Sequence, residues 1–167
     1  MAACAEAVEW VGRRGLKTAW RDCPRGDWML WLGGRLDIDR KLLVLAACDC
    51  AETALKYVPE GEDRPAKAIQ TARNWCNGTA TVQECRAAAD AAYAAADAYA
   101  GATAGADAAY AAADAADAAG AYADADAWNA YADADAAAAA YAAADADAAR
   151  TNKWKEIERL FIKHCGE

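Results

Sequence analysis

Serine is missing from this 167-residue chain, which also has only one His and one Phe. Without serine, hydrolysis by a Ser–His pair is excluded, because that chemistry needs a hydroxyl nucleophile beside a base. The single His, His164, is followed by Cys165, but a zinc site needs four ligands, and no second pair of ligands occurs at a suitable spacing. The sequence therefore predicts a protein that is not an enzyme and that holds no cofactor and no metal.

Long apolar runs are also missing. No uncharged stretch of about 20 strongly apolar residues occurs, as a membrane-spanning helix would need. The start of the chain has no basic segment followed by an apolar run, so we expect no signal peptide and a cytoplasmic protein. The seven cysteines are an odd number, and in a reducing compartment they are predicted to be free thiols that act as small apolar side chains.

Residues 87–149 contain no Lys, Arg or Glu, and they include 40 Ala, 11 Asp and 6 Tyr. We call this segment the alanine tract. Alanine is the strongest helix former, so the tract is predicted to be helical. It has few bulky side chains to bury, so its helices must pack closely. The large apolar residues, including five of the seven Trp, occur mainly in residues 1–86 and in the last 18 residues, where we expect the main core.

The pattern contains no convincing strand and predicts an all-α protein, a helical bundle with an Ala/Asp/Tyr-rich helical hairpin extension. We expect a single domain over residues 1–167. Its parts are a Trp-rich helical core (1–86), acidic alanine-rich helices (87–149) and a C-terminal helix that docks on the body (150–167).

Helices are predicted over 3–14, 16–22, 28–32, 39–57 and from about 62 to 76. The helix over 39–57 is apolar nearly all round and is predicted to lie at the centre of the bundle. A capping box of Thr81 and Glu84 should open the long helix that leads into the tract. We expect the hairpin turn at 101–105, and Gly120 is a candidate second break.

Several Asp pairs in the tract are seven residues apart, which places the members of each pair on one helix face. The hypothesis of an acidic binding face rests on eight residues: Asp90, Asp97, Asp107, Asp114, Asp117, Asp124, Asp126 and Asp133. One alternative is an outer face that only keeps the alanine surface soluble. Another is mimicry of nucleic acid, which is disfavoured because the tract has one carboxylate per about 9 Å of helix, against one phosphate per about 1.7 Å of duplex.

The charge is distributed unevenly along the chain. Residues 1–86 have 13 Lys and Arg against 12 Asp and Glu, whereas the tract adds 11 Asp, and the net charge is −8. This balance argues against nucleic acid or an anionic membrane as a partner and favours a basic protein, either a toxin or a host factor. The alternative is a structural protein that self-associates into a homo-oligomer through exposed alanine faces.

The sequence Cys48-Asp49-Cys50 suggests a metal or redox site, but residues two apart on a helix point about 200° from each other. The two cysteines are therefore predicted to pack in the core. Asp49 lies among small and apolar residues and needs a partner, and Arg40 and Arg64 are the candidates. We expect a buried polar network of Arg40, Asp49 and Arg64. The alternative is a ligand pocket around these three residues with Trp side chains as walls.

Three blocks of the sequence, 28–51, 57–65 and 68–75, resemble the immunity-protein-five-like group of putative immunity proteins from bacteria and phages. The most specific motifs are Leu-Ala-Ala-Cys-Asp-Cys at 45–50 and Glu-Asp-Arg-Pro at 62–65. The resemblance implies a protein that neutralises a toxin. Its signature residues are Trp31, Asp39, Arg40, Cys48, Asp49, Asp63, Arg64, Pro65 and Trp75.

Overall fold

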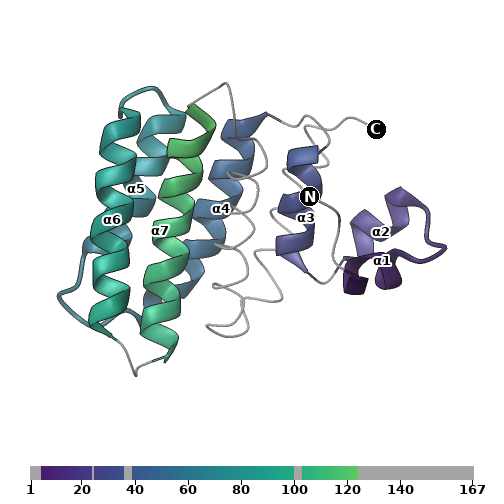
Figure 1. Cartoon of the computed structure of the whole chain (residues 1–167), viewed down its shortest axis with the longest axis horizontal. Helices are drawn as coiled ribbons and strands as arrows, with labels where there is room; N and C mark the ends of the chain where they lie inside the picture. The colour runs from purple at the N-terminus through teal and green to yellow at the C-terminus, as the bar shows by residue number, and fades with distance from the viewer. Residues whose placement is uncertain (1–4, 24, 36–38, 100–102, 124–167) are drawn as a thin grey trace.

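The computed structural model describes residues 5–23, 25–35, 39–99 and 103–123 (Figure 1). Within these ranges the chain forms helices and no strand, which confirms the predicted all-α fold. The helices are α1 (Ala5–Val11), α2 (Leu16–Asp22), α3 (Gly26–Arg35), α4 (Arg40–Ala54), the short 3₁₀ helix η1 (Leu55–Tyr57), α5 (Arg64–Cys76), α6 (Val82–Ala98) and α7 (Thr103–Ala123). The predicted docking helix over 150–167 lies outside the described residues.

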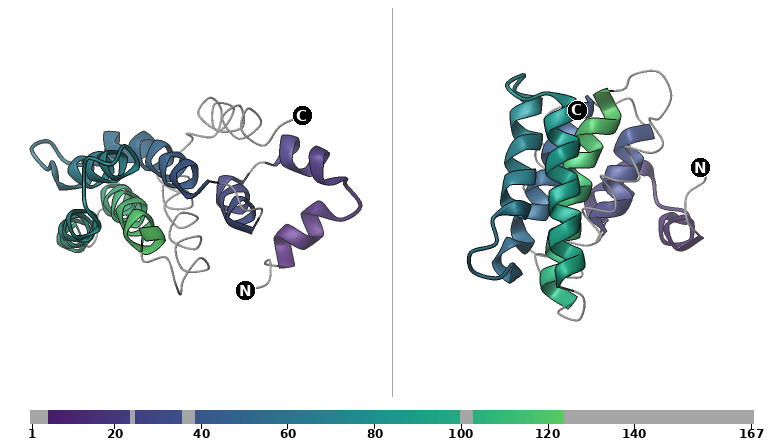
Figure 2. Two further views of the ribbon diagram at one scale, coloured as in Figure 1. Left: turned by 90° about the horizontal axis from the view of Figure 1, so that it is seen from above. Right: turned by 60° about the vertical axis from the view of Figure 1, so that its left-hand side comes forward.

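Helices α4 to α7 stand side by side as a bundle, while α1, α2 and α3 lie beside it (Figures 1 and 2). Helices α6 and α7 form the predicted hairpin, but α7 begins at Thr103, so the turn expected at 101–105 was placed too far along the chain. Helix α7 contacts α4, α5 and α6, and α3 contacts α4. In the described part of the chain, no helix has the length and apolar content that crossing a membrane requires.

Alanine supplies much of the core, contrary to the expectation that large residues in 1–86 would form it. Nine alanines of α7 between residues 108 and 119 are fully buried. Eight of them pack with Leu43, Val44 and Ile69 in one continuous cluster, and Ala109 packs with Ala95 and Ala96 of α6. Small side chains let helix backbones approach closely, so alanine fills the interior without leaving voids. The hairpin is therefore part of the bundle, and α7 lies in its middle.

Local signals set most helix boundaries. Asp39 caps α4 by accepting a hydrogen bond from the Lys41 amide at 2.9 Å, and Thr81 and Glu84 form the predicted capping box. Two predicted ends were wrong. Helix α1 ends at Val11, before Gly12, whose φ of +47° lies in the left-handed region. Helix α3 continues to Arg35 instead of stopping at 33–34.

Gly120 does not break α7, because the helix continues to Ala123. A Cβ at this position would lie 3.2 Å from Cγ of Arg86 on α6. Gly105, in the first turns of α7, is equally close to the Tyr57 carbonyl oxygen, at 3.2 Å. Both glycines therefore permit a close approach between elements, as α7 requires at the centre of the bundle.

Candidate functional site

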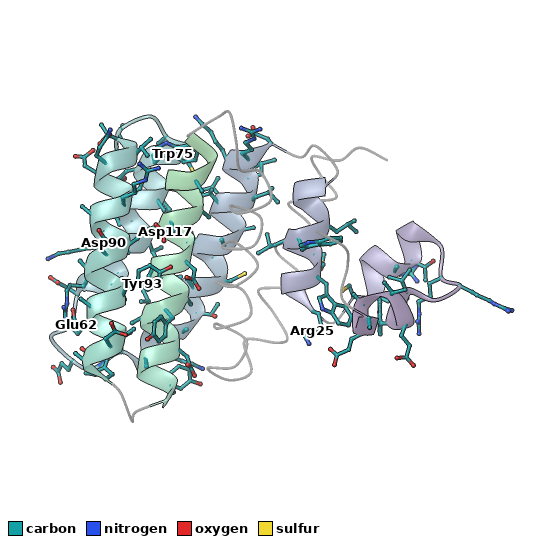
Figure 3. All side chains as sticks on the ribbon, in the orientation of Figure 1. Arg25, Glu62, Trp75, Asp90, Tyr93 and Asp117 are labelled. Carbon is teal, nitrogen blue, oxygen red and sulfur yellow. The ribbon has the colours of Figure 1, made fainter. Side chains whose placement is uncertain are left out.

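The interface between α6 and α7 joins Tyr and Asp side chains across the hairpin. The Tyr93 hydroxyl of α6 donates to Asp114 of α7 at 2.6 Å and also lies 3.2 Å from Asp117 (Figure 3). In the opposite direction, the Tyr110 hydroxyl of α7 donates to Asp97 of α6 at 2.8 Å. The rings of Tyr93 and Tyr110 contact each other, with centroids 6.1 Å apart. Each helix thus gives a tyrosine to the other helix's aspartate.

Burial changes the acidity of the groups in the middle of this interface. It raises the pKa of Asp114 to about 6, although the hydrogen bond from Tyr93 opposes the shift. The pKa of Asp117 is also raised by burial, with a further contribution from Asp90. The pKa of Tyr93 is raised by burial and by the two carboxylates that its hydroxyl contacts. This cluster joins the two helices at fixed positions, and its central carboxylates are partly buried.

Five of the eight aspartates of the predicted acidic face lie in the described part of the chain, and they differ in their exposure. Asp90 and Asp97 are exposed on α6, while Asp107, Asp114 and Asp117 on α7 are partly buried. Asp124, Asp126 and Asp133 lie outside the described residues. The interpretation of the whole tract as a solvated outer face is wrong for α7. The alanines of this helix are buried in the core, and its aspartates are partly buried with them.

Asp49 has a different partner from the two that were expected. Its carboxylate accepts a hydrogen bond from Arg73 of α5 at 2.6 Å, and the same nitrogen lies 2.9 Å from Glu52. Arg64 instead binds Glu62, with its Nε 2.8 Å from a carboxylate oxygen. The predicted network of Arg40, Asp49 and Arg64 is therefore wrong: Asp49 pairs across α4 and α5.

A second polar network fixes the start of α5. Glu62 accepts from Arg64 and from the Tyr99 hydroxyl, the latter at 3.0 Å, so it joins the loop before α5 to the end of α6. The Arg64 guanidinium and amide lower the pKa of Glu62 to about 2. Pro65 in the first turn of α5 is fully buried. The Glu-Asp-Arg-Pro motif thus has a structural role.

The cysteines of the bundle are buried free thiols. Cys48, Cys50, Cys76 and Cys85 are all buried, and burial raises the pKa of Cys76 and of Cys85 to about 11. Among the described residues, no group of three or more His, Cys, Asp and Glu side chains is arranged to hold a metal ion. Thiols with such raised pKa values are poor nucleophiles at neutral pH.

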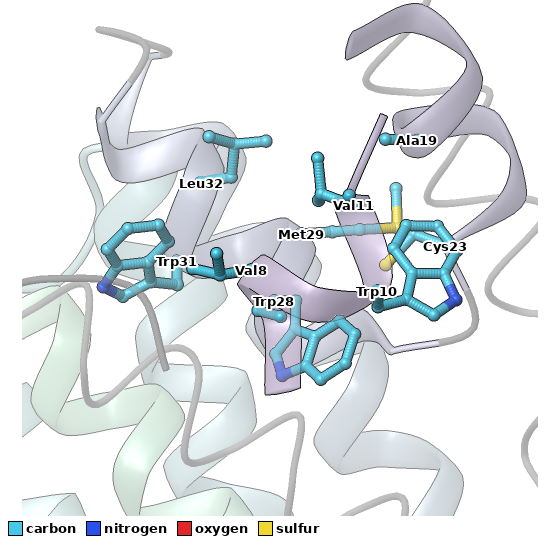
Figure 4. A pocket seen from close by; sticks show the side chains of 11 residues that line it. Val8, Trp10, Val11, Ala19, Cys23, Trp28, Met29, Trp31 and Leu32 are labelled. Carbon is cyan, nitrogen blue, oxygen red and sulfur yellow. The ribbon is translucent and has the colours of Figure 1, made fainter. Parts of the chain in front are cut away.

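A cavity of about 350 Å³ lies between α1, α2 and α3 (Figure 4). Its lining is almost entirely apolar and includes Val8, Trp10, Trp28, Met29, Trp31 and Leu32. The pocket predicted from the sequence lay instead around Arg40, Asp49 and Arg64, with Trp side chains as walls. None of those three charged residues lines the Trp cavity, so it is a different site from the predicted pocket. The close spacing of Trp10, Trp28 and Trp31 near the start of the chain could have indicated this cavity from the sequence.

Two arginines stack on the indoles of this cavity. The guanidinium carbon of Arg14 lies 4.8 Å from the centroid of Trp10, and that of Arg25 lies 4.9 Å from the centroid of Trp28. Trp10 and Trp28 also contact each other, with centroids 6.1 Å apart. Cations and indoles from α1, α3 and their flanking loops therefore meet at one end of the molecule.

Comparison with known proteins gives one family. A family model described as "Imm-5 like putative immunity protein" matches residues 36–160. The match includes α4 to α7 and begins after the cavity-forming helices. Curated proteins yield no match to this chain, and solved structures yield none either.

Proposed function

We infer that this chain, which belongs to the Imm-5 like putative immunity protein family, is a non-catalytic binding protein that neutralises a basic protein partner, either a toxin or a host factor. The family gives the immunity-type role. The exposed acidic side of α6 is the observation that supports direct binding to a basic partner.

One side of α6 exposes two carboxylates. Asp90 and Asp97 are exposed and two helical turns apart, so they share one face. Ala87 and Ala94, which share this face at helical spacing, are also exposed and add no bulk. A partner helix or loop can therefore approach closely enough for its Lys or Arg side chains to reach both carboxylates. We call this surface the α6 acidic face.

Charge should act mainly on the rate of association. The net charge of −8 attracts a basic partner over distances comparable with the Debye length, about 8 Å at physiological salt. The partly buried Asp114 and Asp117 are held by Tyr93 and are not expected to contact the partner. We therefore expect binding to depend on Asp90 and Asp97 rather than on all the aspartates of the tract.

The test is affinity capture from the native host with the full chain, at low and at moderate salt. An Asp90→Asn/Asp97→Asn variant is compared with the parent. The matched control is Glu6→Gln/Glu9→Gln, which removes the same charge from exposed positions on α1. A basic protein should be captured by the parent and the control but not by the Asn variant. Its purified form should then associate more slowly with the parent as salt rises.

Two outcomes would contradict the proposal. Binding that is unaffected by salt and by the Asn substitutions would show that the α6 acidic face is not the docking surface. Empty captures together with a discrete, salt-insensitive oligomer in sedimentation would favour the alternative, a self-associating structural protein.

A further inference from the structure

The cavity between α1, α2 and α3 has no charged residue in its wall, which is built from Ala, Val, Gly, Leu, Met, Cys and Trp residues (Figure 4). Helices α1 and α2 lie at the opposite end of the molecule from α6 (Figure 1). The family match begins at residue 36, so it does not include these helices. Binding of a basic partner at the α6 acidic face therefore does not explain the cavity.

We propose that this cavity binds a small neutral apolar molecule with the bulk of about two fused rings. The molecule lies among the indoles of Trp10, Trp28 and Trp31 and is held by apolar contact alone. This assignment does not rest on the proposed immunity function, because it uses other helices and a ligand of different chemistry.

The size of the ligand follows from the volume. A closed apolar cavity of about 150 Å³ is enough to hold benzene in a protein interior. The present cavity has about 350 Å³, which lies at the lower end of the range for small-molecule sites. A body of two fused rings fits this space, whereas a drug-sized molecule or a nucleotide does not.

The neutrality of the ligand follows from the chemistry of the wall. Apart from the indole N–H groups, the one polar side-chain group that lines the cavity is the thiol of Cys23, which donates to the Arg25 carbonyl at 3.2 Å. The two arginines that stack on indoles are not lining residues. A charged group buried here would lose its hydration without gaining a partner of opposite charge. Water is a poor occupant as well, because a buried water needs two to four polar partners.

The driving force comes from apolar surface that is still in contact with water. Val8 is 60% exposed and Val11 is 37% exposed, and both line the cavity from α1. Covering apolar surface is favourable by about 25 cal/mol per Å². The flexible thioether of Met29, another lining residue, can adjust to the shape of the ligand. The ligand can enter past the exposed valines without unfolding of the three helices.

A protein segment fits this site less well than a small molecule. Specific protein interfaces bury about 800 Å² on each partner. In the described part of the chain, the exposed large apolar residues are Val8, Val11 and Tyr110, and Tyr110 lies on α7, away from the cavity. Two valines beside a small cavity do not make a surface of that extent.

The test uses the purified full chain and isothermal titration calorimetry with two probes of equal size, 2-naphthalenemethanol and 2-naphthoate. The neutral alcohol should bind with a dissociation constant of about 0.1 mM or lower. The charged acid should bind at least about tenfold more weakly, because its carboxylate has no cationic partner in the wall.

A cavity-filling variant locates the site. Ala7 lines the cavity, so Ala7→Phe should weaken binding of the alcohol at least about tenfold while circular dichroism shows unchanged helicity. The matched control is Ala5→Phe, which makes the same change on α1 at an exposed residue that does not line the cavity. This control should bind the alcohol as the parent does.

A second measurement tests the site in the parent chain, even if Ala7→Phe does not fold. Cys23 lines the cavity and is only partly buried, so its labelling by a maleimide can be followed by mass spectrometry. At about five times its dissociation constant, the alcohol leaves about one sixth of the cavities free, so it should slow labelling of Cys23 at least about threefold. The acid at the same concentration should slow it less than about twofold.

Four results would each overturn the proposal. They are no saturable binding of the alcohol up to about 0.5 mM, an affinity for the acid within about tenfold of that for the alcohol, full binding to a folded Ala7→Phe chain, and labelling of Cys23 that the alcohol does not slow. The capture experiment with the basic partner uses residues of α6, so its outcome is independent of these results.

Discussion

Replacing Asp114 by Asn should stabilise the protein, and only above the pH at which Asp114 ionises. The carboxyl group lies in the α6–α7 interface, where burial raises its pKa from 3.8 to about 6. It therefore holds its proton more tightly in the folded protein than in the unfolded chain. The contribution of Asp114 to the free energy of unfolding is therefore largest below about pH 4, and it decreases as the pH rises towards 6.

The magnitude follows from the size of the shift. A rise from 3.8 to about 6 is about two pKa units, and one unit corresponds to about 1.4 kcal/mol. Ionised Asp114 should thus cost about 2–3 kcal/mol of stability at pH 8. Asparagine removes the charge and keeps a side-chain oxygen that can accept the hydrogen bond from Tyr93. Asp114→Asn should recover most of this free energy at pH 8 and change little at pH 4.

The assay is urea denaturation followed by circular dichroism, at intervals from pH 4 to pH 8. Other groups titrate in the same range or below it, and Glu62 acts in the opposite direction because its pKa is lowered to about 2. The relevant quantity is therefore the difference between variant and parent at each pH. Asp97→Asn is the control, because Asp97 also accepts from a tyrosine but is exposed. The free energy of unfolding of Asp97→Asn should differ from that of the parent by no more than about 0.5 kcal/mol at any pH.

A difference between Asp114→Asn and the parent that does not change with pH would refute this reasoning. Destabilisation at pH 8 would refute it as well. The first result would mean that the hydrogen bond from Tyr93 balances the burial penalty on charged Asp114, and the second that it exceeds this penalty.

Three further predictions concern the bundle. Gly120→Ala should stabilise the protein by about 0.5–1 kcal/mol, because the flexible side chain of Arg86 can move away from the added methyl group. Gly105→Ala should destabilise it, because the backbone carbonyl of Tyr57 cannot move away. Thermal unfolding of both variants measures the direction of each change. Arg73→Gln should cost about 1–3 kcal/mol in urea denaturation, because it weakens the charged bond to Asp49, which is mostly buried. Maleimide labelling of the native protein at pH 7, mapped by mass spectrometry, should modify Cys23 first among the described cysteines, since the others are buried.

Local signals in the sequence predicted much of the fold. The capping box at Thr81 and the proline at the start of α5 are short-range patterns, and the structure has both. The hairpin in the tract followed from helix propensity and from a cluster of glycines. These features depend on residues within a few positions of each other, so they do not require knowledge of how the helices pack.

Packing partners were harder to predict. The choice of Arg73 for Asp49 depends on how α5 is rotated against α4, and several arginines near those helices were chemically equivalent candidates. The rotation of α7 about its axis could not be predicted from the sequence for another reason. Its alanines surround the helix, so no apolar stripe indicates which side faces the core. A spacing of seven could therefore place two aspartates on one face without showing that this face is partly buried.

The pairing across the hairpin could have been found from one pattern. Both helices contain a tyrosine followed four residues later by an aspartate, at Tyr93 and Asp97 in α6 and at Tyr110 and Asp114 in α7. When two such helices run antiparallel, each tyrosine lies opposite the aspartate of the other helix. The observed hydrogen bonds follow this arrangement. Alanine surfaces alone would let the helices slide, and these polar pairs fix their register.

The residues that carry the resemblance to the immunity family have structural tasks where the described contacts show them. Asp39 caps α4, Asp49 binds Arg73, and Arg64 binds Glu62. A family signature made of caps and ion pairs specifies the scaffold and leaves the exposed side of α6 free to vary. Partner choice should then depend on exposed positions such as Asp90 and Asp97, of which Asp97 also accepts a hydrogen bond from Tyr110 of α7. On this reasoning, relatives with the same signature but different residues on the α6 acidic face should bind different partners.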